Sequence, residues 1–468
     1  MNVRAATTAS EKLAFFASAF RLHEQAAQRT GQVARALADT FAVAVAGANE
    51  GTCLRALNYV RQELDGGNAR RAGASGSATL WGTGISAPPE AAALWNGIAA
   101  HVLDYDDVTS PMGGHPSVAL LPALVALAEA RGLHGESLVS AYIVGFETAC
   151  KLGWALGSAH YDKGWHTTSS IGTVAAATAC AKLLGLDVRG ISNAIGLAVA
   201  QTAGTRENFG TDAKAFQAGQ CGAAAVRAAL LAEQGFSASA TALDGASGYA
   251  TLYSATDDLA KELSSLGREP LEIDQSGIEV KKYPACYVTH RPIDAVLDFK
   301  REHGLSLEDV RHVSVETSAS GLAPLITHAP TTGVEGKFSL PYVIAAALSD
   351  GAVRLSSFTD DAVRRPDIRS FFGKVDAHEA SGTMTPRWAS VRLTLATGQT
   401  LDRHVDVLRG SPRAPLSDAQ LTEKLVDCLS WGGSRLSAST LLDECVAIGT
   451  RPVRDTLDRI SPQHEETT

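Results

Sequence analysis

Apolar residues recur at helical spacing through most of the first 265 residues. The segments 13–26 and 31–46 carry apolar side chains three and four residues apart, which is typical of helices with one buried face. Further apolar stretches close on a glycine, the residue that best suits the left-handed cap of a helix. These stretches predict helices over 124–132, 174–185 and 223–235. The first half of the chain is therefore expected to be helical.

Prolines mark the ends of other predicted helices. Pro88 and Pro89 suit the first turn of a helix that we expect to continue to Asp107. Pro122 cannot donate the backbone hydrogen bond that a helix interior needs. We therefore expect a break at Pro122, with a longer helix beginning near Leu121.

The pattern changes near residue 270. The segments 310–317 and 389–395 alternate apolar and polar residues, and 401–407 completes a predicted hairpin with the second of them. Helical patterns occupy 292–303, 340–350 and 359–364, and a last helical pattern runs from 416 to about 460.

These elements predict a mainly α protein. We expect a large all-helical domain over 1–269, a smaller α+β lid domain over 270–408, and C-terminal helices over 409–468 that return to the helical domain. The tail 465–468 is expected to be disordered.

Composition narrows the class of protein and of partner. Hydrophobic residues make up 45% of the 468 and charged residues 19%, which is typical of a globular protein. The formal net charge of −9, without a basic patch, makes nucleic acid an unexpected partner. No apolar run is long enough to span a membrane, and no signal peptide is apparent. The seven cysteines form no C-x-x-C pair, which favours reduced thiols in the cytoplasm.

The run from His101 to Ser117 is the densest in groups that can do chemistry. It holds three aspartates and two histidines and passes through a Pro-Met-Gly-Gly turn. On the expected helix, His101, Asp104 and Asp107 follow one edge, whereas Asp106 points elsewhere and is expected to be either solvated or a hydrogen-bond partner at the helix C-terminus. A solvated helix end is the simpler interpretation of these aspartates. No second acidic cluster accompanies them, so we predict no metal site.

Two further segments offer groups for binding a carboxylate. Gly164–Ser169 places a histidine and three hydroxyls before an alanine-rich helix, with Tyr161 just upstream. Lys214 lies in a polar stretch before another such helix, and Lys281 and Lys282 lie at the expected domain boundary. The structural alternatives are helix-capping hydroxyls and solvated lysines. The sequence contains no nucleophile elbow, dinucleotide fingerprint or Walker motif, so we expect no cofactor.

Taken together, these segments resemble the MmgE/PrpD family across nearly the whole chain. The resemblance rests on the following motifs: Asp104-Tyr-Asp-Asp107, Gly114-His-Pro-Ser117, Gly164-Trp-His-Thr-Thr-Ser169, Lys214, Lys281-Lys-Tyr-Pro-Ala-Cys286 and Lys337-Phe-Ser-Leu-Pro-Tyr342. The family includes 2-methylcitrate dehydratases, cis-aconitate decarboxylases and iminodisuccinate epimerases. The resemblance implies a helical domain with an α+β lid, an active site between them, a homodimer, and neither metal nor organic cofactor.

The resemblance also implies site residues. The decarboxylase pattern matches at Asp104, His115, His166, Lys214, Lys281 and Tyr342. It departs at Val108, where that branch has a threonine, and at Cys286, where it has a histidine. The epimerase pattern adds Tyr161, which with Lys281 would form an acid/base pair.

We therefore expect a cofactor-independent, dehydratase-like lyase that abstracts a proton next to a carboxylate of a small di- or tricarboxylate. The catalytic candidates are His166, Lys281, Tyr161, His115 and Asp104. The substrate-binding candidates are Lys214, Lys282, Tyr342, Thr167 and Ser169. The alternatives are an epimerising isomerase, a cis-aconitate decarboxylase and, more remotely, a non-enzymatic carboxylate-binding protein.

Overall fold

The computed structural model describes residues 8–22, 25–64, 70–71, 76–254, 256, 259–383 and 386–461. The predicted disorder of 465–468 falls outside these residues. The chain divides into two units. Met1–Val280 together with Leu421–Thr468 form the helical unit, and Lys281–Gln420 form the α+β unit. A mainly α protein with a smaller α+β part is the fold class that the sequence predicts.

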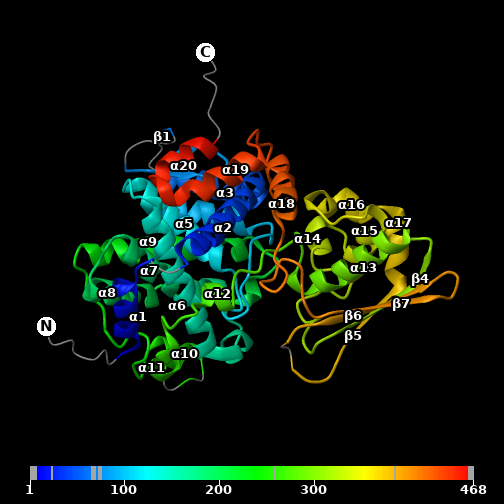
Figure 1. Cartoon of the computed structure of the whole chain (residues 1–468), viewed down its shortest axis with the longest axis horizontal. Helices are drawn as coiled ribbons and strands as arrows, with labels where there is room; N and C mark the ends of the chain where they lie inside the picture. Colours follow the sequence, from blue (N-terminus) through cyan, green and yellow to red (C-terminus); the bar gives the residue numbers. More distant parts are fainter. Residues whose placement is uncertain are drawn as a thin grey trace, which may run out of the picture. The chain divides into compact units, whose positions relative to one another are not determined.

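The helical unit is built from long helices, drawn mainly in blue, cyan and green in Figure 1. They are α1 (Ala9–Ala19), α2 (Ala26–Gly47), α3 (Gly51–Tyr59), α4 (Pro89–His101), α5 (Pro116–Ala130), α6 (Gly135–Asp162), α7 (Thr167–Leu183), α8 (Val188–Val199) and α9 (Asp212–Glu233). Short helices follow: α10 (Tyr249–Tyr253), α11 (Leu259–Glu262) and α12 (Glu272–Gln275).

The end of the chain returns to this unit. Its helices are α18 (Asp418–Trp431), α19 (Ala438–Val446) and α20 (Val453–Ile460), and the red α19 packs against the blue α2 in Figure 1. One small antiparallel sheet accompanies the helices, in the order β1-β3-β2. Its strands are β1 (Arg70–Arg71), β2 (Ala78–Leu80) and β3 (Ile85–Ala87).

Small residues permit a close crossing of α4 and α9 in this unit. A Cβ atom on Gly97 of α4 would lie 2.7 Å from the Cα of Gly219 on α9, and one on Gly219 would lie 2.2 Å from the Leu94 carbonyl oxygen. Only glycine permits such an approach of two backbones. The crossing brings the C-terminal end of α4 next to the first turns of α9, and both ends carry polar side chains.

Two predictions about helix ends are wrong. The helix expected to reach Asp107 ends at His101, because Asp104 adopts a left-handed φ of 55°. The break expected at Pro122 does not occur, and α5 continues through it. Nearly all side chains of α5 are buried, and this packing offsets the roughly 3 kcal/mol that an internal proline costs.

The α+β unit contains a four-stranded sheet in the order β5-β4-β6-β7. Its strands are β4 (Val310–Thr317), β5 (Val375–Glu379), β6 (Ala389–Leu395) and β7 (Thr400–Val405), and only the β4–β5 pair is parallel. Its helices are α13 (His290–His303), α14 (Gly333–Gly336), α15 (Leu340–Asp350), α16 (Asp360–Arg364) and α17 (Pro366–Phe371). Helix α13 packs on β6 and β7, and α15 packs on α13.

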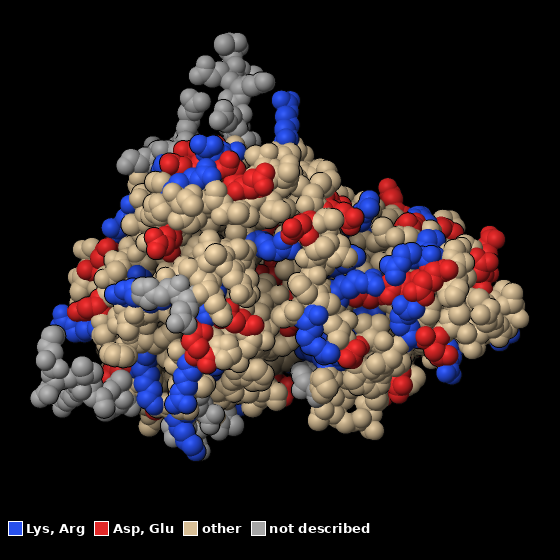
Figure 2. All heavy atoms as spheres, in the orientation of Figure 1, with Lys and Arg blue, Asp and Glu red and all other residues tan. Residues whose placement is uncertain are grey.

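The surface charges and the apolarity of the helices can be described for the residues that the structure covers. Figure 2 shows basic and acidic side chains mixed over the drawn face, without a broad area of one sign. Among the described residues, no helix has the length and apolarity needed to cross a membrane. All seven cysteines are buried and free.

Candidate active site

The ends of four helices in the helical unit hold one group of polar side chains. His101 is the last residue of α4, His115 and His166 are the N-cap residues of α5 and α7, and Lys214 lies in the first turn of α9. The ring centroid of His101 lies 4.7 Å from that of His115 and 5.7 Å from that of His166. Three imidazoles and a lysine that are far apart in the sequence therefore meet in one place.

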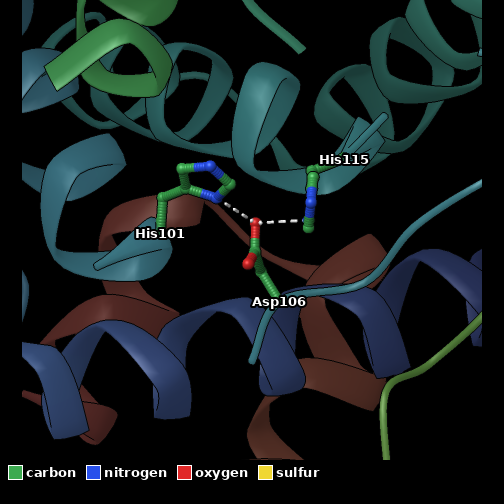
Figure 3. A group of neighbouring side chains, drawn as sticks. All are labelled: His101, Asp106 and His115. Atoms are coloured by element: carbon green, nitrogen blue, oxygen red, sulfur yellow. Dashed lines mark hydrogen bonds and ion pairs between the residues drawn. The ribbon is translucent and has the colours of Figure 1, made fainter. Parts of the chain in front are cut away.

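Asp106 joins two of these imidazoles (Figure 3). Its Oδ2 lies 2.8 Å from Nδ1 of His101, in a hydrogen bond, and 3.0 Å from Nδ1 of His115. The Asp106 side chain is fully buried. Of the two alternatives expected for Asp106, solvation is therefore wrong, because the chain leaves the helix after His101 and turns this carboxylate inward.

Burial and mutual charge set the protonation of this group. Burial alone would raise the pKa of Asp106, but the imidazoles of His101 and His115 outweigh it and hold the pKa well below its usual range. Burial lowers the pKa of His101 to about 4, which the nearby Asp106 offsets only in part. At neutral pH the site therefore contains an ionised carboxylate beside a neutral His101.

His166 is held on the other side of His101. Its Nδ1 lies 2.7 Å from Oε1 of Gln217, and the amide nitrogen of Gln217 donates to the Thr205 carbonyl oxygen at 3.1 Å. Burial lowers the pKa of His166 well below its usual value, and the nearby His101 and Lys214 lower it further. His166 is therefore also neutral at neutral pH.

Lys214 supplies the positive charge of the group. Its Nζ donates to Oδ1 of Asp104 at 2.6 Å and lies 5.7 Å from the ring centroid of Phe209, which in turn contacts His166 edge-on. Both charged side chains are largely buried. Asp104 itself has the left-handed φ and lies three residues after the end of α4.

Hydrogen bonds from α7 position His115. Thr168 Oγ1 accepts from the His115 backbone N–H at 3.1 Å, and Thr167 Oγ1 donates to the Gly113 carbonyl oxygen at 2.6 Å. A Cβ on Gly114 would lie 2.8 Å from Thr167 Oγ1, so this position requires glycine. Two of the three hydroxyls expected at the site, those of Thr167 and Thr168, thus hold the segment that carries His115, and substrate binding by Thr167 remains a prediction.

A buried network supports the segment between α4 and α5. Asp107 accepts from the backbone N–H and hydroxyl of Ser117, and the Ser117 hydroxyl lies 2.7 Å from that of Tyr142. Lys424 of α18 pairs with Asp39 at 2.6 Å and donates to the Tyr105 carbonyl oxygen at 2.8 Å. Asp107 is therefore part of the support, not of the edge that was expected to carry Asp104.

The remaining predicted residues lie as follows. Ser169 is buried in the first turn of α7, and Tyr161 near the end of α6 lies under the Arg206 guanidinium, 3.9 Å from ring centroid to Cζ. Lys281 begins the α+β unit, two residues after Glu279, which pairs through its backbone with Val108. The catalytic or binding roles expected of Ser169, Tyr161 and Lys281 remain predictions.

Two more candidates lie within the α+β unit. Tyr342 is buried in its core, and its hydroxyl donates to the Ser357 carbonyl oxygen. The ammonium of Lys282 lies 5.9 Å from the ring centroid of Tyr283. Substrate binding by either residue also remains a prediction.

Sequence reasoning did not select Gln217 or assign a role to His101. Gln217 lies three residues after Lys214, one turn along α9, so helical spacing was the one available signal. No pattern indicated that Asp106 would bind two histidines.

A metal ion is an alternative to consider for His101, Asp106 and His115, whose ligand atoms lie within 4.8 Å of one another. Nitrogen and oxygen ligands of a tetrahedral zinc are about 3.3 Å apart. The two nitrogen–oxygen distances here, 2.8 and 3.0 Å, are shorter; the first is that of a hydrogen bond and the second that of an ion-pair contact. These two contacts between the imidazoles and the carboxylate account for this geometry.

A cavity of about 210 Å³ in the α+β unit is a second place where charged groups gather. Arg409 pairs there with Asp298 at 2.6 Å and with Asp294 at 3.3 Å, and Arg403 pairs with Asp298 at 3.0 Å. These charges satisfy one another, so this cluster holds α13 to the strand β7 and the residues that follow it.

Comparison with known proteins gives consistent matches over both units. The profile of the MmgE/PrpD N-terminal domain matches residues 11–262, and that of the MmgE/PrpD C-terminal domain matches residues 283–446. The chain is 30% identical over 361 residues to cis-aconitate decarboxylase of Homo sapiens, covering 74% of each chain. It is 30% identical over 373 residues to the Mus musculus enzyme, covering 74% and 73%, and 27% identical over 337 residues to the Aspergillus terreus enzyme, covering 65% and 66%.

Proposed function

The chain belongs to the MmgE/PrpD family, and from this premise we propose that it is a cofactor-independent lyase acting on a small di- or tricarboxylate. The observation that carries the proposal is the meeting of Asp104, His115, His166 and Lys214 at the helix ends of one unit. The relatives support it, because they are named as decarboxylases of a tricarboxylate.

Lys214 and the helix N-termini would bind the substrate carboxylates. A lysine ammonium and the positive ends of α5 and α7 favour an anion, and they act strongly where water is excluded. A bound carboxylate would compete with Asp104 for Lys214. Asp104 would then accept a hydrogen bond from a substrate hydroxyl or orient the lysine.

The histidines would move the proton. In a dehydration, His166 takes the proton from the carbon next to a carboxylate, the C–H electron pair forms the double bond, and hydroxide leaves with a proton from an acid such as His115 or Tyr161. In a decarboxylation, the bond to CO₂ breaks first, its electron pair stays on the substrate, and an acid then protonates that carbon. A neutral His166 is suited to accept the proton in a dehydration, whereas the relatives' names favour a decarboxylation.

One experiment separates these reactions from the isomerase alternative. The protein is incubated in D₂O with cis-aconitate, 2-methylcitrate and an amino dicarboxylate, and each mixture is followed by NMR. Loss of CO₂, loss of water, or deuterium exchange without net loss identifies the decarboxylase, the dehydratase or the epimerase. Binding without any turnover would contradict the lyase and leave a carboxylate-binding protein.

Variants then test the site. Removal of the proton-transferring group in His166→Ala should lower turnover by about 10²–10⁴-fold. Removal of the charge in Lys214→Met should lower it by about 10²–10³-fold. Lys163→Met removes an exposed lysine of the same unit and is the matched control. Equal turnover in all three variants would exclude this site. The same assay tests the other candidates, which are Lys281, Lys282, Tyr161, Tyr342, Thr167 and Ser169.

The proposal extends to assembly and location. A homodimer in the cytoplasm is consistent with the family, the net charge of −9 and the seven free cysteines. Light scattering at micromolar concentration tests the dimer, and a monomeric mass would contradict it.

A further inference from the structure

The orientation of the Gln217 amide determines which nitrogen of His166 carries a proton. The amide nitrogen donates to the Thr205 carbonyl oxygen, so the amide oxygen faces His166. The opposite orientation would place two oxygens against each other at Thr205. An amide oxygen only accepts, so Nδ1 of His166 must be the protonated nitrogen and Nε2 must carry a lone pair.

The backbone fixes Thr205 itself. The His166 N–H donates to the Gly204 carbonyl oxygen at 3.1 Å, and the Arg206 N–H donates to the Gly164 carbonyl oxygen at 2.8 Å. The two segments therefore pair on both sides of Thr205 and Trp165. The acceptor that orients Gln217 is held by the segment that carries His166.

Asp106 imposes the same choice on His101. An ionised carboxylate can only accept, so the 2.8 Å contact requires a proton on Nδ1 of His101. Nε2 of His101 is buried and has no hydrogen-bond partner among the described residues. Burying a ring nitrogen without a hydrogen bond costs free energy of folding, and such an atom in a native structure calls for a functional explanation.

We infer that Asp106 and Gln217 are positioning residues that hold His101 and His166 as Nδ1–H tautomers, so that each presents an unprotonated Nε2 as a proton acceptor. The inference rests on the proposed function for its catalytic consequence, but the tautomers are properties of the protein without substrate. It assigns a role to Gln217, which lies outside the sequence motifs, and to Asp106, which lies within one of them but had no role assigned.

The charges around the rings are consistent with neutral imidazoles. His101 faces Asp106, Lys214 and His115, and His166 faces His101, Lys214, His115 and the neutral Gln217. Asp106 in turn lies near the buried Asp39 and Asp107. Lys214 and the two neighbouring imidazoles disfavour a second proton on either ring.

The first test reads the tautomers directly. The two-bond ¹H–¹⁵N spectrum of ¹⁵N-histidine-labelled protein at pH 7 distinguishes protonated from bare ring nitrogens. His101→Gln and His166→Gln variants assign the two signals among the 13 histidines. We expect a bare Nε2 on both rings. A proton on Nε2 of either ring would overturn the inference, whereas the proposed lyase activity could still stand.

The second test uses Gln217. In Gln217→Glu, a carboxylate still accepts from Nδ1 and its charge raises the pKa of His166, so the acidic limb of the kcat profile should move up by at least about one pH unit. In Gln217→Leu, the acceptor is lost and kcat should fall at least about tenfold with little change in KM. An unmoved pH profile together with unchanged kcat would contradict the role of Gln217.

The third test uses neighbouring carboxylates. Asp106→Asn loses the charge that both imidazoles contact, and kcat should fall at least about tenfold while KM changes less than threefold. Asp107→Asn is the matched control, because Asp107 is equally buried and burial raises its pKa to about 8, so it is already largely neutral at pH 7. Equal effects of the two substitutions on kcat would show that Asp106 has only a structural role, which would refute the inference. Absence of turnover by the wild-type protein on every substrate would refute the proposed function and leave the tautomers to the first test.

Discussion

The buried pair of Lys424 and Asp39 gives a sharp prediction about stability. The Lys424 side chain is 2% exposed and the Asp39 side chain 0%, with 2.6 Å between Nζ and Oδ1. Lys424 also donates to the Tyr105 carbonyl oxygen and lies 4.3 Å from the Tyr105 ring centroid. Lys424→Met keeps much of the volume but leaves a buried carboxylate and a backbone carbonyl without their partner. Breaking a buried pair from one side costs about 3–5 kcal/mol, which we expect as the loss in the free energy of unfolding.

The effect should depend on pH with a definite sign. Burial raises the pKa of Asp39 above its usual value, and Lys424 opposes that rise. A raised pKa in the folded state means that stability from this group is lost as pH rises through that pKa. Without Lys424 the pKa rises further, so the deficit of Lys424→Met should be smallest near pH 5 and larger at pH 8.

Urea unfolding followed by tryptophan fluorescence measures the change. The double variant Asp39→Asn/Lys424→Met removes the buried charge as well and should be more stable than Lys424→Met alone. Lys163→Met, at an exposed position, should change the free energy of unfolding by less than about 0.5 kcal/mol. A deficit below about 1 kcal/mol, or no recovery in the double variant, would refute the reasoning.

Three further predictions follow from packing, protonation and burial. Gly97→Ala should destabilise the protein by about 1–3 kcal/mol through the clash with α9. Gly31 of α2 has open space around it, so Gly31→Ala should stabilise the protein by up to about 1 kcal/mol. Urea unfolding measures both changes, and equal effects would contradict the close crossing. Burial raises the pKa of Asp107 to about 8, so its contribution to stability is present at low pH and is lost as pH rises through 8. The stability of Asp107→Asn relative to wild type should therefore increase between pH 4 and pH 9. A constant difference would contradict a neutral Asp107. The seven buried thiols should react with a colorimetric thiol reagent only after unfolding, and rapid reaction of the native protein would show that one is accessible.

Elements with a regular pattern were predictable from the sequence. The alternation of Val310–Thr317 and Ala389–Leu395 coincides with β4 and β6, each of which has one buried face. β5 (Val375–Glu379) was missed because it has only five residues, two of them apolar, and none is fully buried. The end of α4 was misplaced because helical spacing continues past it, and nothing local signals the left-handed Asp104.

Four of the candidate site residues could be named from the sequence, whereas their connections could not, and their catalytic or binding roles stay predictions. Asp104, His115, His166 and Lys214 were selected, and they do meet. The bonds of Asp106 to His101 and His115 and of Gln217 to His166 depend on how four helices pack, which is set by contacts far apart in the chain. Residue type and spacing therefore identify candidate groups, whereas tertiary packing decides which of them a carboxylate or amide orients.

The position of Lys424 in the chain has a consequence for biosynthesis. Asp39 emerges from the ribosome early, but its cationic partner is translated only after the whole Lys281–Gln420 unit. Throughout that interval the nascent helical unit has an Asp39 carboxylate without its Lys424 partner and a surface on α2 that α19 has yet to cover. The inserted unit can therefore finish folding before the domain that surrounds it in the sequence, and the loop that carries Asp106 acquires its last support when translation is nearly complete.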